Sequence, residues 1–293
     1  MAIRTIFSMV EDCSRGERLG WQEFVRDFAG IARALLTHYF LTLVPDIDEH
    51  VVAVFRRAGA HTPCTGSPAR PALTHQEQAG GGGHSSSGAT WFTGLSFSNE
   101  REFLMAFRDL VFAYGREEER IPAPDVSLDQ LRAIVRDLTL LEREMLWLIL
   151  KGYDGARIAA IMMNAAATAE AVKRIADERL TALIPGAAPE DLAPSARVLM
   201  ELAEQSKTDK CASLKNFNNL VNGQITWRER ELAEEHMSNC FCCIDRFTTF
   251  QEMVRLRVDV PPLPEPQVEA ILARLPFAAG KPRGVLSRLF AGR

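Results

Sequence analysis

The stretch from Cys211 to Cys243 constrains this chain most, because it combines a histidine with several cysteines at short spacings. His236, Cys240 and Cys243 follow one another as His-x3-Cys-x2-Cys, which on a helix corresponds to positions i, i+4 and i+7. Those positions lie on one helix face. Imidazole and thiolate are ligands of tetrahedral zinc sites, and the upstream Cys211 can supply a fourth ligand. The spacing therefore predicts a Zn²⁺-binding segment, with Cys242 pointing away as a spare thiol.

Two other interpretations of these residues stay open. Buried, reduced cysteines that only fill a core are common. Within a zinc site, a spare thiol beside a ligand also allows a redox switch, since exposed thiolates oxidise. A zinc hydrolase is disfavoured, because four protein ligands leave no coordination position for water. No Ser/His/Asp set, phosphate loop or pair of carboxylates stands out in the sequence, so we expect a protein that is not an enzyme.

Length and composition favour several small domains in a reducing compartment. A chain of 293 residues suits two or three domains. Four of its six cysteines lie between positions 211 and 243, which favours a metal site over a disulfide framework. We expect no signal peptide, no membrane span and a cytoplasmic location, because long apolar runs are missing. The net charge of −4 is well mixed, so a nucleic-acid role would need a local site.

Apolar residues recur at three- and four-residue steps along most of the chain, which predicts an all-α fold. Thr139 and Glu142 form a capping-box pattern, and further helices flank Gly223. Residues 59–90 differ, because they are rich in Gly, Ser, Pro and Thr and lack periodicity. We expect a disordered insertion there. The main predicted helices before this insertion cover 20–43 and 46–58.

Two short helices between positions 127 and 184 have the outline of a helix-turn-helix. A plain packing hairpin has the same outline. The second helix, from Thr168 to Leu180, carries three basic and three acidic side chains. Because neutralisation of phosphates supplies much of the affinity for DNA, a helix without net charge should bind DNA weakly, or only when tethered to a larger complex. The candidate DNA contacts are Thr168, Lys173, Arg174 and Arg179.

Taken together, these pieces resemble a bacterial RNA polymerase sigma factor of the extracytoplasmic-function group, with an anti-sigma-like zinc domain fused behind it. The likeness covers most of residues 17–256. WQEFVRDF through HYF and EREFLMAFRDLVFAYGR resemble helices of sigma region 2, the second of which opens the −10 promoter element. LLEREMLWLILKGYDGARIAAIM is similar to region 4, which binds the −35 element. The turn at Gly223, the RER run and the Cys and His residues resemble the anti-sigma zinc domain.

The resemblance implies four parts and a set of partners. DIDEHVVAVFRRA is similar to the helix that docks on the β′ subunit, so the implied contacts to RNA polymerase core are Asp48, Glu49, Val51 and Phe55. Promoter DNA is the second implied partner, and the zinc domain is expected to contact the sigma-like parts within the chain. The implied domains are a region-2-like bundle at 17–116, a region-4-like helix-turn-helix at 125–184, an anti-sigma-like zinc-binding domain at 200–258, and a linker with a short helix and basic tail at 259–293.

Several positions depart from the pattern of that family. Val52 and Ala53 stand where Gln-Glu is usual in the docking helix, Tyr114 stands where Asn is usual, and Met163 replaces a turn glycine. Two functions therefore stay open. The chain is either a sigma-like initiation factor regulated by its own zinc domain, or a sigma-derived interaction protein that no longer reads promoters.

Overall fold

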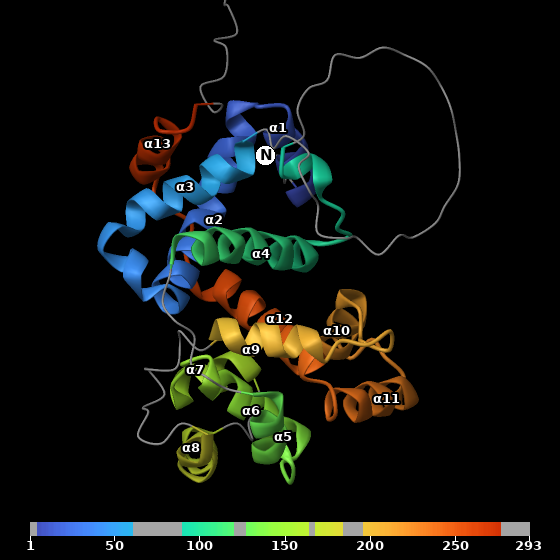
Figure 1. Cartoon of the computed structure of the whole chain (residues 1–293). Coiled ribbons are helices and arrows are strands. Elements are labelled where there is room, and N and C mark those ends of the chain that lie inside the picture. Colours follow the sequence, from blue (N-terminus) through green and yellow to red (C-terminus); the bar gives the residue numbers. More distant parts are fainter. Residues whose placement is uncertain (1–4, 61–89, 120–126, 164–167, 184–195, 277–293) are drawn as a thin grey trace, which may run out of the picture. The chain divides into compact units, whose positions relative to one another are not determined.

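The structure is a computed structural model that describes residues 5–60, 90–119, 127–163, 168–183 and 196–276 (Figure 1). All regular elements in these ranges are helices, which confirms the all-α fold class. Nearly all of the predicted insertion lies outside the described residues. The chain divides into two compact units, whose limits differ from those of the predicted domains. The first comprises Met1–Ala29, Val51–Ser96 and Pro262–Arg293, and the second comprises Gly30–His50 and Phe97–Pro261.

The first unit has an aromatic core. Phe24 lies against Phe55 with ring centroids 4.9 Å apart, and Trp21 lies against Phe92 at 5.3 Å. Both pairs meet edge to face, the arrangement that the charge distribution of aromatic rings favours. The elements of this unit are α1 (Ile6–Ser14), the first part of α2 (Arg18–Tyr39), most of α3 (Ile47–Gly59), η2 (Phe92–Gly94) and α13 (Glu265–Leu272).

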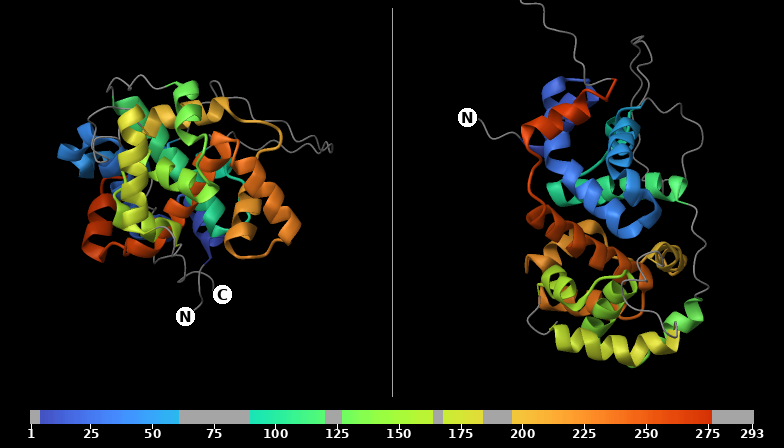
Figure 2. Two further views of the ribbon diagram at one scale, coloured as in Figure 1. Left: turned by 90° about the horizontal axis from the view of Figure 1, so that it is seen from below. Right: turned by 90° about the vertical axis from the view of Figure 1, so that its left-hand side faces the viewer.

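The second unit is built around α12 (Phe241–Asp259), most of whose side chains are buried. This helix packs against α4, α6, α7 and α9 (Figure 1). In Figure 2, α8 (yellow) runs beside α6 and α7 (green), with which it is in contact. The other elements of the unit are the end of α2, η1 (Leu41–Asp46), α4 (Glu100–Glu118), α5 (Leu128–Val135), α6 (Leu140–Leu150), α7 (Gly155–Met162), α8 (Ala169–Leu183), α9 (Ala196–Gln205), α10 (Leu214–Val221) and α11 (Trp227–Met237).

Local sequence signals explain where several helices begin and end. Thr139 and Glu142 form the predicted capping box at the start of α6. Gly152 follows α6 with a φ of 84°, a left-handed conformation that glycine adopts without steric cost. The helix predicted over 20–43 ends earlier, at Tyr39, because the chain then enters a 3₁₀ segment that contains Pro45.

A buried ion pair joins α6 to α12. Lys151, at the end of α6, has no exposed surface, and its Nζ lies 2.9 Å from Asp245 Oδ1. The same ammonium donates to Thr249 Oγ1 at 2.8 Å, and Trp147 Nε1 donates to Asp245 Oδ1 at 2.9 Å. Burial disfavours the Asp245 carboxylate, but Lys151 and Arg108 more than offset this and lower its pKa. The Asp245 carboxylate is therefore stabilised by its neighbours inside the protein.

A second buried polar cluster lies about two helical turns further along α12, at Glu252. The Glu252 carboxylate accepts hydrogen bonds from Tyr39 Oη at 3.0 Å and from Tyr153 Oη at 2.7 Å. The His38 ring stacks on Tyr153 with centroids 4.2 Å apart. Burial, together with the charge of Glu252, raises the pKa of both tyrosines. Because an unpaired buried polar group costs about 1–3 kcal/mol, these contacts specify how α12 is rotated about its axis.

Candidate metal centre

Short capped helices bring the predicted ligands together. Cys211 lies just before α10, whose N-cap Ser213 accepts a hydrogen bond from the backbone of Asn216. After α10 the chain turns at Gly223, which has a φ of 66°. Thr226 then caps α11 through a capping box. The resulting helix pair returns the chain towards Cys211.

The three downstream ligands do not lie on one helix, contrary to the prediction from their spacing. His236 is in the last turn of α11, Cys240 is the N-cap residue of α12, and Cys243 is in the first turn of α12. The chain leaves helical geometry between them, after Ser238 caps α11. Arg143 of α6 donates to the carbonyl of Ser238 and so supports this turn. The ligands therefore converge from a helix end, a turn and a helix start.

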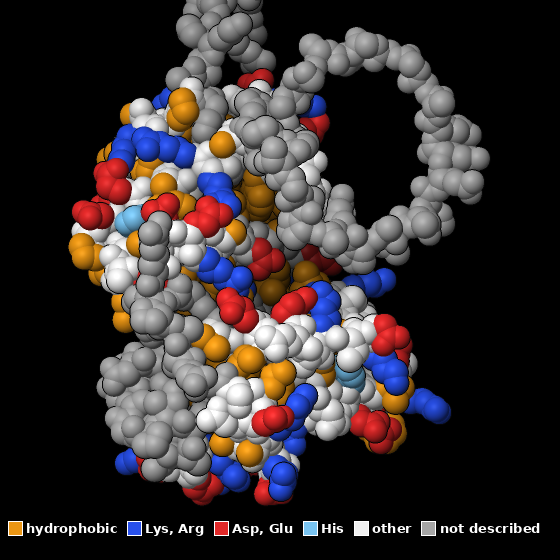
Figure 3. Space-filling model, in the orientation of Figure 1, with side chains coloured by type: hydrophobic (Ala, Val, Ile, Leu, Met, Phe, Trp, Pro, Cys, Tyr) orange, Lys and Arg blue, Asp and Glu red, His pale blue; other side chains and the backbone are white. Residues whose placement is uncertain are grey.

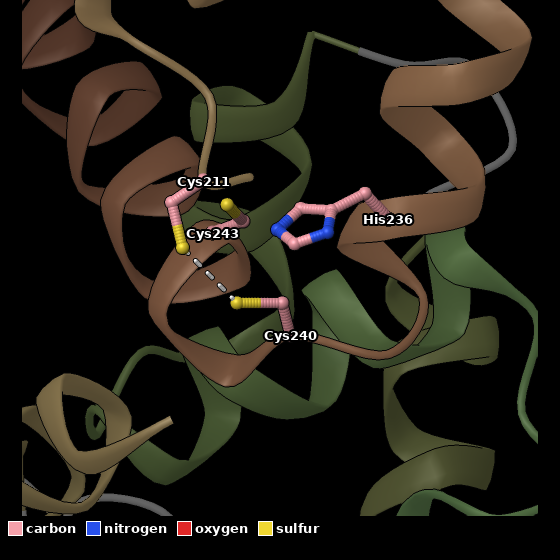
Figure 4. Close-up of side chains that lie close together, drawn as sticks. All are labelled: Cys211, His236, Cys240 and Cys243. Atoms are coloured by element: carbon pink, nitrogen blue, oxygen red, sulfur yellow. Dashed lines mark hydrogen bonds between the residues drawn. The ribbon is translucent and has the colours of Figure 1, made fainter. Parts of the chain in front are cut away.

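The four side chains form a compact cluster (Figure 4). One ligand atom from each of Cys211, His236, Cys240 and Cys243 lies within 4.8 Å of the others. Cys211 Sγ and Cys240 Sγ are 3.6 Å apart. Two thiolates bound at about 2.3 Å to a tetrahedral ion lie about 3.8 Å apart, so this separation is close to that of a ligand pair.

The surroundings of the cluster suit thiolate ligands. The backbone N–H of Thr208 donates to Cys211 Sγ at 3.2 Å, and that of Ala212 donates to Cys243 Sγ at 3.4 Å. Burial disfavours the Cys211 thiolate, yet hydrogen bonds from Thr208, His236 and a neighbouring thiol lower the pKa of Cys211 to about 6. Nε2 of His236 is buried without a hydrogen-bond partner in the described part of the chain. A metal ion would satisfy such an imidazole.

The cluster can hold a metal ion with four protein ligands. A closed set of this kind is typical of structural sites, because no position is left for a reacting water. Cys242 lies outside the cluster, as predicted for a spare thiol. Its Sγ is 3.9 Å from a Glu204 carboxylate oxygen, and burial, followed by the charges of Cys211 and Glu204, raises its pKa to about 12. Cys242 is therefore a protonated thiol at neutral pH.

The predicted DNA contacts lie on α8 or at its start, and only some have free polar groups. Thr168 is exposed, but its hydroxyl accepts from the backbone of Ala171 at 3.2 Å. Lys173 is exposed. Arg174 pairs with Glu142 of α6 at 2.7 Å. Nε of Arg179 is buried with no hydrogen-bond partner among the described residues. Figure 3 shows basic and acidic side chains intermixed on the face that it draws.

The predicted polymerase contacts divide into exposed and buried residues. Asp48 is exposed and pairs with Arg33, and Glu49 is also exposed. Val51 and Phe55 are buried, with 1% and 0% of their surface accessible. Neither side chain is exposed in this structure, and the expectation that Val51 and Phe55 contact RNA polymerase stays a prediction. Both side chains pack into a core, because the apolar stripe of α3 faces its neighbouring helices.

Sequence reasoning missed the polar residues that the second unit buries. No role is predicted from the sequence for Lys151, Asp245, Glu252 or Glu144. Glu144 is only 7% exposed. The spacing gave one signal, because Asp245 and Glu252 lie seven positions apart and so share one face of their helix.

None of the described helices is both long enough and apolar enough to cross a membrane. Comparison of the chain with protein-family models gives no match. Comparisons with curated proteins and with solved structures give no match either. The sigma-factor resemblance consequently stays a prediction from the sequence.

Proposed function

We propose that this protein is a sigma-like transcription initiation factor, which binds RNA polymerase core and promoter DNA and is regulated by its own zinc domain. One observation carries the proposal. The helix that begins at the Cys/His cluster, α12, packs against α4 and against α6 and α7 within the second unit. By resemblance, α4 opens the −10 element, and α6 and α7 belong to the part that binds the −35 element. The single helix α12 thus covers α4 as well as the pair formed by α6 and α7.

The metal in this proposal is Zn²⁺. Three thiols and one imidazole are donors that zinc prefers, and the set is closed, as in structural zinc sites. A bound ion would join the start of α12 to the end of α11 and to the segment before α10. The zinc domain would then hold α12 in register for its contacts with α4 and α6.

Regulation would take the form of a population shift between two states. In the closed state α12 covers the promoter-reading helices, and in the open state those helices engage polymerase and DNA. Because both partners belong to one chain, the effective concentration of α12 is on the order of millimolar, and the closed state needs little intrinsic affinity. The protein acts as a binding factor rather than an enzyme, in the cytoplasm where polymerase is found.

Run-off transcription with purified core polymerase tests this proposal. The template is a pool of genomic fragments, and the RNA starts are sequenced. We expect specific starts that depend on the protein, and a change in their number when a chelator removes the metal or when Cys211→Ser weakens the site. Cys242→Ser is the matched control, since this thiol lies outside the cluster. Transcription starts that do not depend on the protein would refute the proposal.

A second function is favoured by the state of α8 and α3. Arg174 is engaged in an ion pair with Glu142, and the apolar residues Val51 and Phe55 are buried. A sigma-derived interaction protein that binds another protein through its zinc domain needs neither surface. In the transcription assay such a protein would give no specific starts on any template, although it would still bind metal.

A further inference from the structure

A cavity of about 500 Å³ lies in the second unit, where Phe247 and Gln251 of α12 form part of its wall. Its walls come from five helices: α6, the end of α7, α10, α11 and α12. The volume falls within the range of about 300–1,000 Å³ that small-molecule sites occupy. The metal cluster does not line it. The cavity is therefore a separate feature of the unit.

The apolar part of the cavity wall is broad. Leu141, Met162, Leu220 and Phe247 line it from four different helices. Methionine side chains adapt to the shape of a ligand, and methionine is common at binding surfaces for that reason. An apolar body of a few carbon atoms would replace water on this wall.

Two polar side chains in the cavity wall, Glu144 and Gln251, are largely buried. Glu144 is 7% exposed, and no hydrogen bond or ion pair of its carboxylate is seen in the described residues. Gln251 is 8% exposed, and its Oε1 is buried without a partner. Buried polar groups are normally satisfied, so the unpaired amide oxygen of Gln251, in the same wall as the Glu144 carboxyl, indicates a missing donor.

The charges around the cavity favour a cation as that donor. The titratable groups in its wall are Glu144, Arg230 and Glu234. Arg230 and Glu234 pair with each other at 2.7 Å, which leaves Glu144 as the uncompensated group. Burial, and then the charge of Glu234, raises the pKa of Glu144 to about 8. A bound ammonium would reverse this effect, because an opposite charge stabilises the carboxylate.

We propose that this cavity binds a small amphiphilic cation, whose ammonium or amidinium group is held by Glu144 and Gln251 and whose apolar body lies on the Leu141–Met162 wall. The site is additional to the proposed function and does not depend on it. Since the walls belong to α6 and α7 on one side and to α10, α11 and α12 on the other, the ligand would hold these two groups of helices together. It would thereby stabilise the second unit.

Hexylammonium serves as the probe, with hexanol and hexanoate as matched controls for its charge. Ligand-observed NMR and calorimetry on the full chain measure binding. We expect hexylammonium to bind with a dissociation constant on the order of 1 mM, and the two control compounds to bind much more weakly. Affinity for hexylammonium should rise from pH 6 to pH 9, because Glu144 must lose a proton to pair with it.

The Glu144→Gln variant distinguishes binding in the cavity from nonspecific attraction of the cation to acidic side chains on the protein surface. Loss of a charge-assisted hydrogen bond should weaken hexylammonium binding by about tenfold or more. Gln251→Met removes the second acceptor and should weaken it less. Glu231→Gln, an exposed change on α11 outside the cavity, should leave it unchanged. Equal binding of hexylammonium by the Glu144→Gln and Glu231→Gln variants, or equal binding of hexanoate by the wild type, would overturn the proposal.

The binding results can be interpreted because the Glu144→Gln variant is expected to stay folded. Glutamine is uncharged, like the protonated form of Glu144, so Glu144→Gln should fold and bind metal as the wild type does. The readout is binding of a small molecule and involves neither polymerase nor DNA. A negative result here therefore leaves the proposed function untouched, and failure of transcription leaves this site untouched.

Discussion

Removal of the Lys151 charge tests directly whether the buried ion pair with Asp245 holds α12 against α6. Lys151→Met deletes an ammonium that contacts Asp245 Oδ1 at 2.9 Å and Thr249 Oγ1 at 2.8 Å, with no exposed surface on the lysine. Methionine has nearly the same length and fills the same space. What remains is the Asp245 carboxylate, 8% exposed and paired only with the Trp147 indole and the more distant Arg108.

The expected cost follows from that isolated charge. Breaking a buried ion pair on one side destabilises proteins by about 3–5 kcal/mol. With a denaturant slope of roughly 2–3 kcal/mol per molar, the urea midpoint of the second unit should fall by about 1–2 M. Lys151→Met combined with Asp245→Asn removes both charges and keeps an acceptor for Trp147. The double variant should lose about 2 kcal/mol less than the sum of the two single variants.

Urea unfolding followed by circular dichroism measures these values on metal-loaded protein. Arg132→Met is the control, because its pair with Asp129 has the same 2.9 Å separation but side chains that are 62% and 89% exposed. Exposed pairs contribute little, so the control midpoint should stay at the wild-type value. If Lys151→Met unfolds at the same urea concentration as Arg132→Met, the ion pair does not hold α12 as argued.

Three further predictions concern acid, metal and backbone conformation. Folding lowers the pKa of Asp245, so its contribution to the free energy of unfolding is complete above the unfolded pKa of about 3.9 and is lost as the pH falls through the folded pKa. In an acid titration followed by circular dichroism, the wild type should therefore lose more stability than the Lys151→Met/Asp245→Asn variant. His236→Ala should lower bound zinc in metal analysis and lower the melting temperature, whereas Cys242→Ser should change neither, since structural zinc contributes folding free energy. Met163→Gly should raise the unfolding free energy by about 1 kcal/mol in urea titrations, because Met163 has a left-handed φ of 48°; an unchanged or lower value would show that its side chain contributes more than the strain costs.

The position of Met163 illustrates how a departure from a family pattern can be explained physically. The sequence predicts a turn there, and the structure confirms a left-handed residue directly after α7. Glycine would adopt this conformation without cost. The methionine side chain lies instead in the wall of the cavity that Glu144 also lines. The strained residue and the unpaired acid thus belong to one feature.

Local patterns were sufficient wherever the interaction spans a few residues. The capping box of Thr139 and Glu142, the turn at Gly223 and the helical periodicity of α4 could all be predicted, because each depends on neighbours within one or two turns. The ligand set of Cys211, His236 and the two downstream cysteines could also be predicted from residue type and spacing. Its geometry could not, since the break between α11 and α12 depends on capping and on Arg143 from another helix.

Contacts between distant segments were decided only by the tertiary structure. Lys151 and Asp245 lie 94 residues apart, and no local pattern distinguishes either from a solvated charge. The burial of Phe55, the unpaired carboxyl of Glu144 and the central place of α12 have the same origin. Side-chain chemistry and short-range spacing are written in the sequence, and they specified the helices and the members of the Cys/His cluster. Which faces meet depends on how helices pack, and that packing sets which charges are buried, paired or left for a ligand.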